Sequence, residues 1–164
     1  MLNFDYQNPT RIIFGQGSTS KLSRSVPPKA RVLVLYGGGS VRRNGTLDDV
    51  LAALQQDGER HVAEFSGIEP NPTFETLMRA VQQVHEEQID FLLAVGGGSV
   101  IDGTKFVAAA ARLSAGEDAW SILESRGRVI KDALPFGAVL TLPATGSEMN
   151  AGGVVTRAAT HDKI

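Results

Sequence analysis

The sequence has no cysteine, so it excludes disulfide bonds and zinc sites built on thiolates. It also lacks any apolar run near the roughly 18 residues that a membrane span requires. The residues after Met1 lack the basic and apolar regions of a signal peptide. The net charge is −2, without the basic excess that favours nucleic acid as a partner. We therefore expect a cytoplasmic protein that binds neither nucleic acid nor membranes.

Histidine is scarce as well. His61, His85 and His161 are the three present, and no two of them have the spacing of metal ligands. No Ser/His/Asp arrangement is legible. We therefore predict neither a metal ligand nor a catalytic acid within this sequence.

Glycine, in contrast, is abundant and clustered. Eighteen of the 164 residues are glycine, above the usual share of about 7%. Gly37–Gly39 follows the apolar run 31–36, and Gly96–Gly98 follows the apolar run 91–95. Continuous β-branched and apolar runs are typical of strands buried on both faces. The glycine blocks are therefore predicted to be tight turns at strand ends.

Hydrophobic periodicity and end signals predict further elements. Thr46 and Thr73 are candidate N-caps for the first two predicted helices. The predicted helices are 47–56, 74–87 and 100–113, with a helical turn at 120–123. The predicted strands are 11–14, 31–36, 62–65, 91–95, one within 135–142, and 152–156. Strands that alternate with helices imply a parallel sheet. The fold class is therefore α/β, a Rossmann-like parallel sheet with flanking helices in one domain, residues 1–164.

The second glycine turn has the chemistry of an anion site. Gly97 and Gly98 let a ligand approach the main chain, and the first N–H groups of the next helix favour a negative charge. Ser99 adds a hydroxyl donor. The pyrophosphate of a dinucleotide suits this position, outside the carboxyl ends of the strands. Ile101 replaces the third glycine of G-x-G-x-x-G, which disfavours a standard Rossmann domain. The alternative is a tight turn that binds no ligand.

Asp102 lies in the first turn of the same predicted helix. It can stabilise the helix dipole, pair with Lys105 three residues later, or contact a cofactor near its ring end. The sequence leaves the ion pair and the site role open.

The first glycine turn would meet the adenosine end of such a cofactor. No acid occurs between Tyr36 and Leu47, and Ser40, Arg42 and Arg43 stand there instead. NAD-binding turns commonly place a carboxylate on the ribose, whereas a ribose phosphate carries about 1.5 to 2 negative charges. The composition favours NADP over NAD. The alternative is two solvated surface arginines.

Polar residues also follow the predicted strand within 135–142. Thr141, Thr145 and Ser147 carry hydroxyls that suit ribose or phosphate, although such residues more often form turns. Asn71 lies between two prolines, where turn formation is again the more common role.

These stretches together resemble the iron-dependent alcohol dehydrogenase family, and within it the NADPH-dependent aldehyde reductases and butanol dehydrogenases. The combination of GGGSxxDxxK with TxxxTGSE is the most specific feature. The segments that carry the resemblance are 10–15, 36–40, 67–72, 94–105 and 141–148.

The resemblance implies an N-terminal nucleotide-binding domain, similar to that of dehydroquinate synthase and glycerol dehydrogenase, followed by a helical domain. The cofactor would lie between the two. The family's metal ligands, one Asp and three His, belong to the helical domain. We therefore expect the chain to be the N-terminal part of a longer protein, with the metal-binding helical domain missing.

By residue-to-residue match the resemblance also assigns a cofactor path. Gly38, Gly39 and Ser40 would contact the adenosine ribose and its 2′-phosphate. Gly97, Gly98 and Ser99 would hold the pyrophosphate, with Asp102 near the nicotinamide. The remaining contacts would come from Thr141, Thr145, Ser147, Lys163 and Asn71.

The resulting functional hypothesis is an oxidoreductase that transfers hydride between NADP(H) and an aldehyde or primary alcohol. A divalent iron or zinc ion in the missing half would assist, and this chain alone would be inactive. We also expect a homodimer. Two alternatives stay open: a non-catalytic nucleotide-binding or self-associating module, and an enzyme of the glycerol dehydrogenase or dehydroquinate synthase type.

Overall fold

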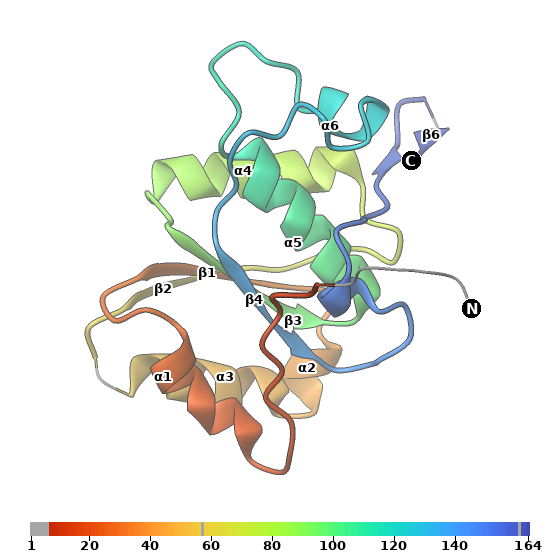
Figure 1. The fold of residues 1–164 in the computed structure, drawn as a ribbon. Helices are drawn as coiled ribbons and strands as arrows, with labels where there is room; N and C mark the ends of the chain where they lie inside the picture. The colour runs from red at the N-terminus through yellow and green to blue at the C-terminus, as the bar shows by residue number, and fades with distance from the viewer. Residues whose placement is uncertain (1–6, 57, 161) are drawn as a thin grey trace.

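A four-stranded parallel sheet forms the centre of the computed structural model, which describes residues 7–56, 58–160 and 162–164. The strand order is β2-β1-β3-β4, and each neighbouring pair is parallel. The strands are β1 (Arg31–Tyr36), β2 (His61–Phe65), β3 (Phe91–Gly96) and β4 (Phe136–Leu140). The predicted α/β fold class is confirmed (Figure 1).

Helices cover both faces of the sheet (Figure 1). One layer contains α1 (Leu22–Ser25), α2 (Ser40–Arg43) and α3 (Thr46–Gln55), and the other contains α4 (Phe74–Glu86) and α5 (Gly98–Ala110). The short elements are η1 (Ser18–Lys21), α6 (Ser121–Glu124), η2 (Ser147–Met149), β5 (Thr156–Arg157) and β6 (Asp162–Lys163). The last two pair antiparallel in a hairpin near α6.

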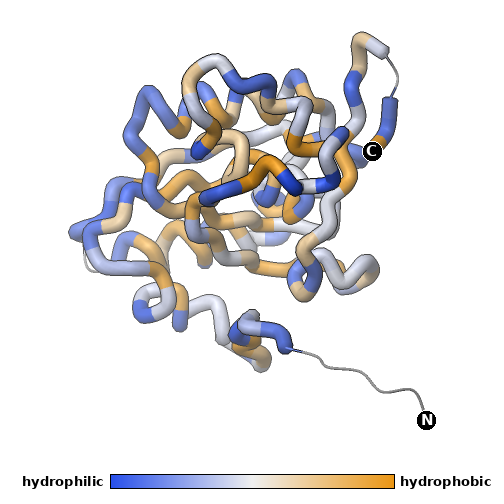
Figure 2. The backbone as a smooth tube through the Cα atoms, turned by 45° about the horizontal axis from the view of Figure 1, so that its top comes forward, coloured by the Kyte–Doolittle hydropathy of each residue, from blue (hydrophilic) through white to orange (hydrophobic). Residues whose placement is uncertain are grey.

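Strand β1 shows why the central strands are apolar throughout. Successive side chains of a strand point to opposite faces. Leu33 and Leu35 pack into the core on the α4–α5 face, whereas Val32, Val34 and Tyr36 pack into the core that includes α3. Both faces of β1 are therefore covered by hydrophobic side chains. Figure 2 shows the hydrophobic stretches mainly inside the molecule and the hydrophilic ones mainly on outer turns.

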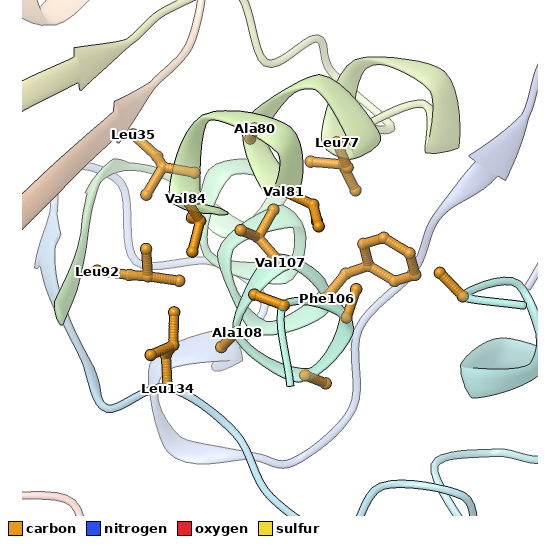
Figure 3. Close-up of a cluster of buried hydrophobic side chains, with 14 of the residues drawn as sticks. Leu35, Leu77, Ala80, Val81, Val84, Leu92, Phe106, Val107, Ala108 and Leu134 are labelled. Carbon is orange, nitrogen blue, oxygen red and sulfur yellow. The ribbon is translucent and has the colours of Figure 1, made fainter. Parts of the chain in front are cut away.

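The helix periodicity of α4 is visible in the larger core. Leu77, Ala80, Val81 and Val84 are all buried, at spacings of three and four residues. They meet Leu35 and Leu92 from the strands, and Phe106, Val107 and Ala108 from α5 (Figure 3). The predicted cap is confirmed, because the Thr73 side chain accepts a hydrogen bond from the Thr76 N–H.

Two predicted strands and one predicted cap are wrong. Residues 11–14 form no strand, since they pair with no strand among the described residues, and Phe14 is 96% exposed. In the predicted strand 152–156, only Thr156 belongs to an observed strand. The Val154 N–H donates to the Asp102 side chain and not to a neighbouring strand. Thr46 is the first residue of α3, and the preceding Gly45 caps it in a left-handed conformation at φ 80°.

Burial of Leu92 yields a stability prediction. Leu92→Ala removes methyl groups from a site with 0% exposure, which costs about 2–5 kcal/mol. Leu142→Ala is the matched control, because Leu142 is 66% exposed and such a change stays within about 0.5 kcal/mol. Urea unfolding of the two variants measures both costs. Equal losses would contradict this account of the core.

Candidate functional site

The two glycine turns lie at the same edge of the sheet. Parallel strands β1 and β3 are neighbours, with Tyr36 paired to Val95 at their carboxyl ends. Gly37–Gly39 leads from β1 into α2, and Gly97 leads from β3 into α5. Ligands of open α/β sheets bind outside this edge.

The beginning of α5 offers main-chain donors. Gly97 precedes the helix in an extended conformation, and as a glycine it has no side chain that could cap the first N–H groups. The N–H groups of Gly98 and Ser99 donate to no other residue in the described part of the chain. The helix is 13 residues long, so its dipole adds partial positive charge at this end. The turn thus provides two N–H groups and the Ser99 hydroxyl to an anion.

Hydroxyl side chains pack against this turn. A Cβ on Gly98 would collide with Thr145 Oγ1 and lie 3.2 Å from Ser147 Oγ. The two hydroxyls are 2.7 Å apart, and Ser147 is buried. The structure therefore brings Thr145 and Ser147 to the second glycine turn. Thr141 is at the same edge, since its N–H donates to Gly96 O at 3.0 Å.

A second group joins three segments far apart in sequence. Asn71 N–H donates to Ser99 Oγ at 3.3 Å, and Lys163 Nζ donates to Asn71 Oδ1 at 2.7 Å. Asn71 has a left-handed backbone with φ 56°, a conformation that asparagine tolerates better than most residues. Asn71 therefore forms a turn and lies beside Ser99 at the same time. Lys163 adds a positive charge next to the turn.

Asp102 and Lys105 form the ion pair that the sequence left open, with 3.8 Å between Asp102 Oδ1 and Lys105 Nζ. Lys105 Nζ also donates to Asn150 Oδ1 at 3.0 Å and to Gly152 O at 2.6 Å. Burial lowers the pKa of Lys105, and Asp102 opposes that shift. Asp102 Oδ2 accepts from Val154 N–H at 3.2 Å, whereas buried Oδ1 accepts no hydrogen bond from the described residues. Oδ1 therefore faces Lys105 in the ion pair, and both oxygens of Asp102 are oriented by groups of the chain itself.

The first glycine turn is more open than the second. A Cβ on Gly37 would lie 3.0 Å from Ile68 O, so Gly37 serves chain packing. A Cβ on Gly38 would meet no described atom within 4 Å, and Gly39 needs its left-handed φ of 103°. Ser40 begins α2. Among the described residues, no hydrogen bond joins Gly38, Gly39 or Ser40 to the second turn.

Sequence reasoning missed an acid beside the first turn. Glu64, near the end of β2, lies 2.7 Å from Arg42 Nη2 and accepts from the Tyr36 hydroxyl at 2.8 Å. Burial raises the pKa of Tyr36, which keeps the hydroxyl protonated as a donor. Arg42 is therefore ion-paired, not merely a solvated arginine. The turn itself contains no acid, and Glu64 lies 22 residues from Arg42 in sequence. The signal was the predicted strand 62–65, the neighbour of β1.

Other features lie away from this edge. The described residues contain no group of three or more His, Asp or Glu side chains that could hold a metal, and His161 lies outside them. His61 pairs with Glu87 at 3.1 Å. A groove of about 810 Å³ runs between α4 and the segment after α5. In the part of the chain that the structure describes, no helix is long and apolar enough to span a membrane.

Known proteins place this arrangement in a family. The sequence matches the iron-containing alcohol dehydrogenases over residues 9–164. The chain belongs to this family of oxidoreductases. The family resemblance inferred from the five sequence segments is thereby confirmed.

Two members of the iron-containing alcohol dehydrogenase family match nearly the whole length of this chain. It is 57% identical to the NADPH-dependent aldehyde reductase YqhD of Escherichia coli K12 over 163 residues, which are 99% of this chain and 41% of that protein. It is 50% identical to the probable NADH-dependent butanol dehydrogenase 1 of Bacillus subtilis 168 over 164 residues, 99% of this chain and 41% of that protein. The chain thus spans about two fifths of the length of these relatives.

Solved structures agree with the fold. The crystal structure of Escherichia coli K-12 YqhD aligns with a TM-score of 0.94 at 57% identity, covering 98% of this chain and 40% of that one. The NADH-dependent butanol dehydrogenase A of Thermotoga maritima aligns with a TM-score of 0.89 at 39% identity, covering 98% and 40%. Family members therefore share this parallel sheet and its flanking helices.

The packing at Gly98 yields a prediction about the site. Gly98→Ala places a methyl group against Thr145 Oγ1, and such overpacking costs about 1–3 kcal/mol. Thr145→Ala removes the opposing hydroxyl, so the double variant should recover part of that loss. Urea unfolding of the four proteins in this cycle measures the coupling. Additive losses would show that Gly98 and Thr145 are not in contact.

Proposed function

We propose that this chain is the NADP(H)-binding domain of an enzyme that interconverts aldehydes and primary alcohols. One observation carries the proposal: two unpaired N–H groups and the Ser99 hydroxyl meet at the beginning of α5, on the ligand-binding edge of the sheet. This set matches a pyrophosphate in charge and in hydrogen-bonding capacity. The names of these two relatives support a nicotinamide cofactor and an aldehyde or alcohol substrate, and the name of the Escherichia coli relative supports NADPH in particular.

The other residues at this edge suit the remaining parts of a dinucleotide. Gly97, Gly98 and Ser99 would hold the pyrophosphate. Asp102 would lie near the nicotinamide end, held in place by Lys105 and by the Val154 N–H. The remaining proposed contacts are Asn71, Thr141, Thr145, Ser147 and Lys163 along the path, and Gly38, Gly39 and Ser40 at the adenosine ribose.

The chemistry divides between this domain and the rest of the enzyme. Hydride transfer belongs to the cofactor, and this domain would bind and orient it. The described residues do not fit a metal, so we derive no step through one from this chain. The expected homodimer, the cytoplasmic location and the choice of iron or zinc stay predictions. A nucleotide-binding module without catalysis remains the second candidate, because we assign no catalytic acid to the described residues.

Nucleotide binding tests the proposal. Calorimetric titration with NADPH should show one site, and Ser99→Ala should weaken it by about 3- to 10-fold, the value of one hydrogen bond. Ser114→Ala is the matched control, since Ser114 is exposed beyond the end of α5, away from both glycine turns. Equal affinity of the two variants would remove Ser99 from the site, and an absence of binding would remove the proposed function.

Turnover separates the domain from the whole enzyme. The purified 164-residue chain should not reduce aldehydes with NADPH, and added Fe²⁺ or Zn²⁺ should not change this, because the described residues offer no metal-ligand cluster. Absorbance of NADPH at fixed aldehyde concentration is the measurement. Appreciable metal-dependent turnover would contradict the assignment of the metal site to another part of the enzyme.

A further inference from the structure

Family membership leaves the cofactor preference undecided. The relative at 57% identity is named NADPH-dependent, whereas two relatives at 50% and 49% are named probable NADH-dependent. Proteins this similar share the fold and the main-chain turns. A few side chains near the adenosine ribose must therefore set the preference.

The cluster of Tyr36, Arg42 and Glu64 lies where such side chains are expected. Tyr36 ends β1, and Arg42 lies in α2 two residues after Ser40. Glu64 is paired opposite Val34 near the carboxyl end of β2. In dinucleotide-binding folds, an acid about 20 residues beyond the glycine turn binds the ribose hydroxyls of NAD, and an arginine accommodates the phosphate of NADP. This cluster contains one of each.

The contacts fix the Arg42 guanidinium while leaving one edge of it available. Its Nε donates to the Tyr36 hydroxyl at 3.0 Å, and its Nη2 bonds the same hydroxyl and Glu64 Oε2. The guanidinium carbon lies 5.2 Å from the centre of the Tyr36 ring. The Arg42 side chain is 57% exposed, and its Nη1 donates to no residue in the described ranges. A phosphate can therefore meet Nη1 without breaking these bonds.

We propose that Glu64 sets the cofactor preference of this domain, by holding Arg42 beside the first glycine turn and by opposing a ribose phosphate with its own charge. The inference rests on the proposed nucleotide site. A 2′-phosphate carries about 1.5 to 2 negative charges, so Arg42 attracts it and Glu64 repels it. The same Glu64 carboxylate can accept a hydrogen bond from a free 2′-hydroxyl, which favours NAD. Glu64 thus limits the discrimination that Arg42 provides.

The test compares the dissociation constants of NADPH and NADH, measured by calorimetry at one ionic strength. Glu64→Gln keeps the shape and an acceptor oxygen for Tyr36 and Arg42 but removes the charge. It should tighten NADPH by about 2- to 5-fold, the range of an exposed charge interaction, and leave NADH unchanged or weaker. A merely structural role for Glu64 would move both affinities together.

Arg42→Gln should act in the opposite direction and weaken NADPH by roughly 10-fold, as loss of a charged hydrogen bond implies. Arg24→Gln is the matched control. It removes the same charge from an exposed arginine of α1, beside Gln56 at the end of α3 that lies away from the first glycine turn, so the NADPH affinity should change by less than about 2-fold.

The outcomes separate the inference from the function on which it rests. If the unsubstituted chain binds neither nucleotide, both fail. If it binds a nucleotide but Glu64→Gln leaves the NADPH-to-NADH ratio unchanged or lowers it, the inference alone fails. Equal effects of the two arginine substitutions would also overturn it, because Arg42 would then act only as general surface charge.

Discussion

The exit of β3 into α5 is the constraint on which the site depends. β3 is buried on both faces between β1 and β4, so the chain must turn sharply where the strand ends. A Cβ on Gly96 would lie 2.6 Å from Val100, which makes glycine a requirement of the turn itself. The turn leaves the first N–H groups of α5 at the sheet edge, and the polar side chains of the site are arranged around them.

Helix α5 also binds the segment 150–154, which passes beside it. Asp102 accepts from Val154 N–H, and Lys105 donates to the Asn150 side chain and Gly152 O. These bonds compensate the burial that lowers the pKa of Lys105. The segment that carries Thr145 and Ser147 is therefore anchored to the same helix whose N-terminus it lines. The bonds that stabilise this loop therefore also fix the geometry of the anion site.

Local patterns made much of the fold predictable, and non-local pairing limited the rest. The apolar runs of β1 and β3, and the spacing of three and four in α4, are properties of short windows. Residues 11–14 have a strand-like composition, but a strand needs a partner, and composition does not name one. Asn71, Ser99 and Lys163 were predicted as separate cofactor contacts. Their mutual hydrogen bonds depend on segments up to 92 residues apart.

The glycines of the two turns have different roles, so each glycine of a motif has to be interpreted separately. Gly37, Gly96 and Gly98 are required because a Cβ would press on neighbouring atoms of the chain. Gly38 is different, since a Cβ there would meet no described atom within 4 Å. A glycine that the chain's own packing does not demand is better explained by the approach of something else. The same reasoning in three dimensions applies to charge: the first turn lacks an acid in sequence, yet Glu64 lies against Arg42. Absence from a motif is therefore not absence from a site.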